Sequence, residues 1–397
     1  MSLLGYGTYY VLKALNRDVF STQELRQRNE VLETGLKWDI NYSLSQSIQL
    51  KGGYQFYEVG IGNEQDVNLP RFRDYEKKVL RTHALYLQSV WNLPSTRIEA
   101  GIRSSYFGKY NEARIEPRLS LRRTLADGWY LEIMGEAKSQ TITQRIDFQS
   151  DFLGIEKRRW VLADEQNNPV IASQQISMGF QYDKQEWYLS AEGFFKKVKG
   201  ITTSNQGFQN QFQFERSQGS YTVYGSELIV NRKLGNLSTW ISYLYLNNQY
   251  EFESLTPQNF PHNLDVPHSL SLAASYTLKN FEIALGLRWR SGKPITRPIE
   301  GAEISFEQRS PSINFESPNS SRLSDYFRSD LSANYQLEIS SNLHAHISIA
   351  LLNILNTENL LNQRYFLGAD SGGTPRVNEV KEYSLGFTPN FSFQLYF

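Results

Sequence analysis

The sequence contains no cysteine, which excludes disulfide bonds, thiolate chemistry and cysteine-based zinc sites. It has no net charge, since 41 Lys and Arg balance 41 Asp and Glu, and no basic block indicates a nucleic-acid partner. Long apolar runs are also missing: no window approaches the roughly 18 apolar residues of a membrane helix. The nearest run, 347–355, is interrupted by Ser348 and Asn353. A helical membrane protein is therefore excluded.

The first residues, M-S-L-L-G-Y-G-T-Y-Y, have no basic region, no sustained apolar run and no small-residue cleavage site, so they do not form a signal peptide. They alternate apolar and polar residues at once, as a strand within a sheet does. We therefore expect the chain to be the C-terminal part of a longer exported protein.

Aromatic residues are abundant at 14%, yet the mean hydropathy is only −0.49. About sixteen runs alternate apolar and polar residues with the period of a β-strand. Many match or exceed the roughly 9–11 residues that a tilted strand needs to cross a bilayer. Their approximate cores are 4–15, 30–42, 47–60, 79–91, 96–108, 114–124, 129–139, 174–183, 187–198, 220–231, 237–250, 268–278, 281–290, 326–337, 343–354 and 383–397.

The polar face of these runs is charged. In 281–290, for example, Phe281, Ile283 and Leu285 alternate with residues that include Glu282 and Arg288. Because burying so many charges in a dry core costs several kcal/mol each unless they are paired, we expect an aqueous interior. The pattern predicts an all-β, antiparallel transmembrane barrel forming one domain over residues 1–397, with lipid outside and water inside.

The connections between the runs alternate in length, and only the segment 109–113 breaks the rule. Short turns on one rim and long loops on the other are typical of outer-membrane barrels, in which the short turns are periplasmic. The predicted long loops are 16–29, 61–78, 140–173, 199–219, 251–267, 291–325 and 355–382.

The last run alternates to the final residue, with Tyr383, Leu385 and Phe387 on the apolar face, and it ends on the aromatic Phe397. A terminal strand of this kind resembles the C-terminal strand of bacterial outer-membrane barrels. That resemblance implies that Phe397 is part of the signal read by the barrel-assembly machinery.

Three stretches resemble the TonB-dependent outer-membrane receptors, particularly those of Bacteroidetes type. They are F-P-H-N-L-D-V-P-H-S-L at 260–270, R-W-R-S-G-K-P-I-T at 288–296 and L-L-N-I-L-N-T-E-N at 351–359. The resemblance implies a barrel of twenty-two strands with an N-terminal plug inside. About six strands and the plug would then lie upstream of Met1.

The resemblance implies active transport of a scarce ligand, such as a siderophore, glycan or peptide, across the outer membrane of a Gram-negative bacterium. Its partners would be the membrane lipid, the unidentified ligand and, through the plug, the TonB complex. Two alternatives remain: a passive porin, which sixteen strands alone would suit, and an outer-membrane adhesin.

Six charged residues are predicted to face the lumen, where they are candidates for contact with a plug or an anionic ligand. Mutual ion pairs across strands are an equally good interpretation. The six residues are Glu99, Arg103, Arg288, Arg290, Arg328 and Asp330. Arg364, Tyr365 and Phe366 are candidate ligand contacts because of their position in a long loop.

No catalytic motif is present, so we predict no enzyme activity and no cofactor. His344 and His346 share one face of a strand, but no third ligand is identifiable, so no metal site is predicted.

Overall fold

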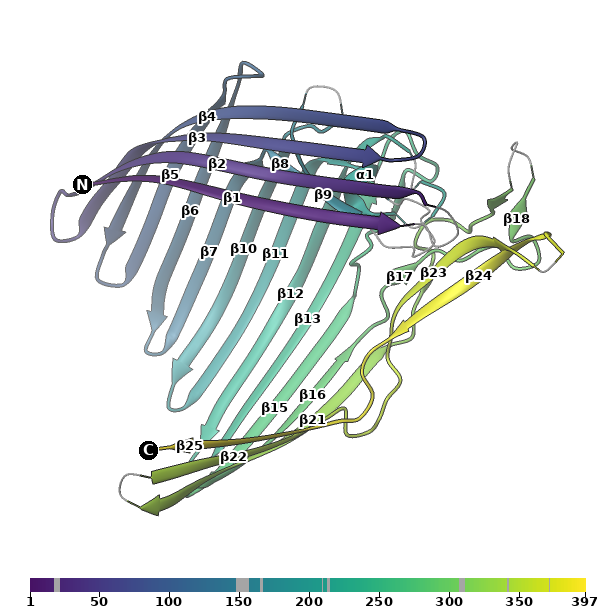
Figure 1. Ribbon diagram of the computed structural model, residues 1–397. Coiled ribbons are helices and arrows are strands. Elements are labelled where there is room, and N and C mark those ends of the chain that lie inside the picture. Colours follow the sequence, from purple (N-terminus) through teal and green to yellow (C-terminus); the bar gives the residue numbers. More distant parts are fainter. Residues whose placement is uncertain are drawn as a thin grey trace.

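The computed structural model describes residues 1–397 except 18–21, 148–156, 165–166, 209, 213–214, 307–310, 341–342 and 371. Sixteen long strands and the three-residue β14 (Asn259–Pro261) form one antiparallel sheet, as the sequence predicted (Figure 1). The long strands are β1 (Ser2–Arg17), β2 (Glu24–Ser43), β3 (Ile48–Val67), β4 (Phe72–Asn92), β5 (Thr96–Phe107), β6 (Glu112–Ala126), β7 (Trp129–Gln140), β10 (Ile171–Lys184), β11 (Trp187–Thr202), β12 (Gln218–Leu234), β13 (Leu237–Glu251), β15 (His268–Leu278), β16 (Phe281–Arg290), β21 (Tyr326–Ser340), β22 (Leu343–Leu352) and β25 (Thr388–Tyr396).

Each long strand pairs with the next one along the chain, so the sheet is a meander that runs from β1 to β25. Figure 1 shows the sheet curling round an open interior, with β1 and β25 as its two edges. The sheet is not closed, because no pairing joins these two edges in the described residues. No described helix is long and apolar enough to cross a membrane.

The polar side chains lie on the concave face. Arg103 on β5 reaches past β4 to donate to Gln55 Oε1 on β3 at 2.5 Å, and Tyr86 on β4 reaches past β3 to Asp39 on β2 at 2.6 Å. Side chains meet across an intervening strand only where curvature brings them together. On the opposite face, apolar side chains such as Leu85 and Ile176 splay apart and are 63% and 56% exposed. The predicted two-faced wall is confirmed.

Several short turns on one rim contain residues with a positive φ. Gly128 has φ 78° and Gly235 has φ 54°, a region that glycine adopts at no steric cost. At the equivalent turn between β10 and β11, Gln185 and Glu186 adopt φ 53° and 64°. These three short turns lie on the same rim of the sheet, as the alternation of short and long connections predicts.

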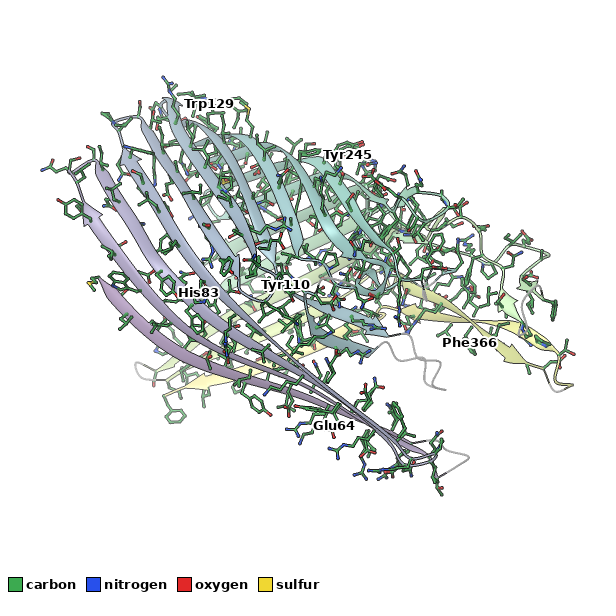
Figure 2. The ribbon with its side chains drawn as sticks, turned by 90° about the horizontal axis from the view of Figure 1, so that it is seen from above. Glu64, His83, Tyr110, Trp129, Tyr245 and Phe366 are labelled. Carbon is green, nitrogen blue, oxygen red and sulfur yellow. The ribbon has the colours of Figure 1, made fainter. Side chains whose placement is uncertain are left out.

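Two of the predicted long loops are wrong. Segments 16–29 and 61–78 mostly continue the strands, since β1 runs to Arg17 and β2 begins at Glu24, while β3 runs to Val67 and β4 begins at Phe72. Charge pairs between facing strands hold this polar ribbon together, including Arg17 with Glu24 at 2.8 Å and Arg73 with Glu64 at 2.6 Å. The ribbon projects past the other strands, and Glu64 lies near its far end (Figure 2).

The other long loops carry small elements of their own. The hairpin β23 (Leu360–Ala369) and β24 (Pro375–Tyr383) extends away from the sheet, whereas β8 (Ile142–Asp147) and β9 (Lys157–Leu162) fold back, so that β9 packs on β2, β3 and β4 (Figure 1). The remaining pieces are α1 (Thr203–Gln206), β17 (Pro294–Ile295), β18 (Ile304–Ser305), β19 (Ser312–Ile313) and β20 (Ser321–Arg322).

The predicted terminal strand 383–397 is also corrected. Tyr383 ends β24, and β25 begins only at Thr388. Two loop asparagines hold the intervening backbone: Asn353 Nδ2 donates to Leu385 O at 3.2 Å, and Phe387 N donates to Asn356 Oδ1 at 2.8 Å. These bonds replace strand pairing, so Leu385 and Phe387 do not belong to the outward face of β25.

Candidate ligand-binding region on the inner wall and loops

Arg103 takes part in a network of hydrogen bonds and an ion pair on the inner wall. Besides Gln55, it donates to Tyr57 OH at 2.8 Å and pairs with Glu116 at 3.3 Å. Glu116 is 7% exposed and also accepts from Ser139 N at 2.6 Å. Every charged atom of this cluster has a protein partner, so the interpretation of Arg103 as part of a cross-strand ion pair describes its surroundings well.

Glu99 lies on the same face but is not joined to Arg103. Its carboxylate accepts from Gln88 Nε2 at 3.1 Å and pairs with Arg97 at 2.5 Å. It also lines a cavity of about 570 Å³, together with Arg118, Glu136 and His262. The structure therefore brings inner-wall charges and one loop histidine to a shared space.

The second group of predicted residues lies on β16 and β21. Arg288 and Arg328 are direct partners in the register, and Arg328 Nε donates to both oxygens of Asp330 at 2.7 and 3.0 Å. Asp330 also accepts from Asn353 N at 2.8 Å. Arg290 ends β16, with its guanidinium 4.8 Å from the centre of the Tyr326 ring. Arg288, Arg290, Arg328 and Asp330 thus form one cluster, separate from Arg103 and Glu99.

Sequence reasoning missed Lys293, which follows β16 at the loop end of this cluster. Its side chain is half-buried, and burial lowers the pKa of its amine, with further contributions from the charges of Arg290 and Arg364. Sequence offered one signal: the segment 288–297 contains four cations and no acidic residue.

The three predicted loop residues lie on β23. Arg364 pairs with Glu382 on β24, and Tyr365 OH accepts from Gln363 Nε2 at 2.6 Å. Burial raises the pKa of the Tyr365 phenol. Phe366 is 50% exposed on the projecting hairpin (Figure 2). Of these three residues, Arg364 carries a charge that contributes to the lowered pKa of Lys293.

The outer loops form a packed cap around an aromatic core. Phe208, Phe252 and Phe260 surround Tyr250, with ring centres 5.2 to 5.8 Å from that of Tyr250. His262 stacks on Tyr250 at 4.2 Å, and burial lowers its pKa to about 4. Tyr250 lies near the end of β13, and the other residues come from the loops after β11 and β13, so the core fixes two loops against each other.

A second apolar cluster lies on the concave face under the β8–β9 hairpin, where Ile61 and Leu80 meet Leu162. Asn29 is 5% exposed and joins the hairpin to the wall, since its Oδ1 accepts from Trp160 N at 3.0 Å. This loop therefore folds inward over the lumen.

The motif 260–270 holds the loops rather than presenting free side chains. Asp265 is 1% exposed; it accepts from Asn248 N at 2.8 Å and pairs with Arg322 at 2.5 Å. Arg322 Nη1 also donates to Gly292 O at 3.1 Å, in the motif 288–296. A Cβ at Gly292 would lie 1.7 Å from Leu323 O, so only glycine fits there.

The motif 351–359 acts similarly at the end of β22, next to the edge strand β25. Asn353 is 1% exposed and accepts from Thr357 N at 3.0 Å, while Asn359 exchanges bonds with the backbone of Phe327 at 2.8 and 2.9 Å. These asparagines satisfy backbone groups where strands give way to loops. All three motifs thus have structural roles at the loop rim.

Phe397 is fully exposed beyond the end of β25. In the part of the chain that the structure describes, no three His, Asp or Glu side chains are grouped to hold a metal ion. His344 and His346 both lie on the inner face of β22, as their register with Tyr396 and Gln394 shows.

The sheet is a curved antiparallel meander with an apolar convex face and a charged concave wall. Tight turns on one rim and a loop cap on the other complete the features of the wall of a transmembrane β-barrel of outer-membrane type. A family model described as TonB dependent receptor-like, beta-barrel matches residues 3–356. The chain belongs to this family, whose barrels lie in the Gram-negative outer membrane and serve as receptors and transporters rather than enzymes.

Solved structures of the same fold include the ferric citrate transporter FecA in its unliganded form, with a TM-score of 0.68 and 13% identity over 99% of this chain and 58% of that one. The ferric yersiniabactin uptake receptor FyuA from Yersinia pestis has a TM-score of 0.65 and 12% identity over 99% and 58%. The siderophore receptor PirA from Acinetobacter baumannii has a TM-score of 0.60 and 12% identity over 99% of this chain and 62% of that one. The chain therefore spans less than two thirds of the length of these structures. No curated protein matches the sequence.

Proposed function

We propose that this chain is the wall and loop cap of a TonB-dependent receptor that actively carries a scarce ligand across the outer membrane. The observation that carries the proposal is a charged inner wall running directly into a packed loop cap, within the fold of a receptor family. The cap captures the ligand outside, and passage follows movement of a plug linked to the TonB complex. No bond chemistry is involved, and the protein is not an enzyme.

The edges of the sheet support the idea that this chain is part of a larger barrel. β1 and β25 would each present unpaired backbone groups to lipid, where each group costs several kcal/mol. Further strands from upstream of Met1, about six in a twenty-two-stranded barrel, would pair with both edges. Closure would then remove the edges, and exposed Phe397 would serve the barrel-assembly machinery.

The predicted site residues divide between two roles in this proposal. Glu99 and Arg103 set the charge of the wall that faces the plug. Arg288, Arg290, Arg328 and Asp330 lie nearer the loops, where a ligand arrives, and Arg364, Tyr365 and Phe366 belong to the outer surface that first meets it.

Conductance and energy dependence separate this proposal from a passive porin. In planar bilayers the complete receptor should be nearly silent, because a plug occupies the lumen. In cells, growth on a panel of ferric siderophores or on glycans that requires the receptor should also require TonB. Large open-channel currents together with TonB-independent uptake would establish a porin, and cell adhesion without any uptake would establish an adhesin.

A further inference from the structure

The loop end of β16 holds three cations that make no ion pair among the described residues: Arg288, Arg290 and Lys293. Two nearby carboxylates are paired with other arginines: Asp330 with Arg328 and Glu382 with Arg364. Asp325 accepts from Gly292 N at 3.1 Å and has no cationic partner among the described residues. Three cations against this one carboxylate leave a surplus of positive charge at the end of β16 and on the residue that follows it.

The backbone under these cations is fixed. Leu323 N donates to Lys293 O at 3.0 Å, and Gly292 N donates to Asp325 Oδ1 at 3.1 Å. Arg290 is further positioned by the Tyr326 ring. Arg288 and Arg290 are two residues apart on β16 and share one face of the strand, and the charge of Arg290 acts on the Lys293 amine. The like charges therefore repel one another on a fixed backbone.

An anion bound between like-charged cations lowers their electrostatic repulsion and so stabilises the arrangement. Guanidinium groups bind carboxylate and phosphate oxygens bidentately. The lowered pKa of the Lys293 amine is consistent with such a site, since a bound anion would favour its charged form.

We propose that Arg288, Arg290 and Lys293 form an anion-binding site at the extracellular mouth of the inner wall. The ligand it takes is a multiply charged anion bearing carboxylate or phosphate groups. This inference rests on the proposed receptor function and names the charge class of its ligand. Arg328 and Asp330 position the site from the neighbouring strand, since Arg328 faces Arg288 in the register.

The test uses the complete receptor, purified in detergent, and the fluorescent trisulfonate pyranine as probe. Anisotropy should show that pyranine binds and that citrate or inorganic phosphate displaces it, while neutral trehalose does not. Arg290→Gln combined with Lys293→Gln should weaken pyranine binding by about tenfold or more, as expected for loss of charge-assisted hydrogen bonds. Arg288→Gln should weaken it less, because Arg288 also lies in the field of Asp330.

The matched control is Arg376→Gln, which removes one exposed cation from β24 and should leave the affinity unchanged. Binding to the wild type should also weaken as sodium chloride rises from about 0.05 to about 0.5 M, since screening shortens the range of the attraction. A heat-modifiable band in gel electrophoresis shows that each variant is folded.

Wild-type receptor that binds no pyranine would overturn the site, as would equal affinity in the folded double variant or an affinity independent of salt. Carboxylates of the plug covering these cations would give the first of these results. TonB-dependent uptake without pyranine binding would reject the anion site and leave the receptor function standing. Pyranine binding without TonB-dependent uptake would support the anion site and reject the receptor function.

Discussion

At the scale of single residues, some of the residues recognisable in the sequence hold the loop backbone in place, and others have no structural role of this kind. Asp265, Asn353 and Gly292 satisfy or fit the backbone of the loops, whereas Arg290 and Lys293 have no such task. Sequence reasoning identified Arg290 but not Lys293, because a lysine in a loop gives no sign of the burial that sets it apart.

Asp265→Asn should loosen the loop cap. Asp265 is buried, and its loss leaves Arg322 without its carboxylate partner. Breaking a fully buried pair costs about 3–5 kcal/mol, but Arg322 is partly exposed, so we expect roughly 2 kcal/mol. Hydrogen exchange of the backbone amides of residues 260–267 and 318–325 measures this loss of loop stability, and it should be faster in the variant than in the wild type.

The control for that variant is Glu382→Gln, which removes the partner of Arg364 in a pair that is open to solvent on both sides. Glu382→Gln should change the free energy of local opening, measured by hydrogen exchange, by about 1 kcal/mol or less. Equal protection of the loop segments in Asp265→Asn and the wild type would show that the pair does not hold the cap.

The cap should also loosen at acid pH through His262. Burial lowers its folded pKa to about 4, below the ordinary value of 6.5, so the opened state binds the extra proton between these two values. The stabilisation is complete above about 6.5 and is lost as pH falls through 4. The imidazole contacts the rings of Tyr221 and Tyr250, and it shares a cavity with charged residues of the inner wall, which are Glu99, Arg118, Glu136, Glu192 and Lys196. The total loss is about 3 kcal/mol.

Hydrogen exchange of 260–267 between pH 7 and pH 4 measures this loss. His262→Phe should remove most of the pH dependence while keeping the ring on Tyr250. The control is His344→Gln on the inner face of β22, which should leave the pH dependence of exchange at 260–267 unchanged. A pH dependence that survives in His262→Phe would assign the effect to another group.

At the scale of elements, period-2 alternation was enough to place all sixteen long strands, because each strand has one face in lipid and one in water. The errors fall where that contrast ends. Beyond the membrane both faces of β1 to β4 meet water, so the polar sequence of 16–29 and 61–78 was interpreted as loop. Cross-strand charge pairs such as Arg73 with Glu64 extend the strands there, and a pairing partner cannot be identified from one strand alone.

The start of the last strand was misplaced for a different reason. The sequence still alternates at 383–387, but side chains of Asn353 and Asn356 take the hydrogen bonds that a neighbouring strand would have taken. The fold could be predicted from periodicity, whereas contacts between distant loops could not. The Bacteroidetes type likewise stays a prediction.

Asn353→Ala should release the segment before β25. It removes bonds to Thr357 N, Thr357 O and Leu385 O from a residue that is 1% exposed, so we expect a cost of about 2–3 kcal/mol. Exchange at 384–388 should rise, whereas Asn390→Ala, an exposed residue on β25, should leave it unchanged. No change in either variant would mean that pairing with β22 alone holds this edge.

At the scale of the whole molecule, the sheet has a lipid face and a water face but two free edges. Residues 1–397 expressed alone should therefore yield little heat-modifiable, protease-resistant barrel, because an open edge in lipid is strongly unfavourable. The same chain with its upstream strands should yield it readily. A stable heat-modifiable band from residues 1–397 alone would show that these strands close by themselves.

The central claim is that lipid surrounds this wall and water lies inside it. The absence of native cysteine allows single nitroxide labels at Leu119→Cys and Ile176→Cys on the convex face, and at Ser120→Cys and Ser177→Cys on the concave face. Electron paramagnetic resonance of the receptor in bilayers should show positions 119 and 176 relaxed by lipid-dissolved oxygen and shielded from an aqueous nickel chelate. Positions 120 and 177 should show no exposure to lipid. Nickel access at 119 and 176, with lipid contact at 120 and 177, would contradict the account.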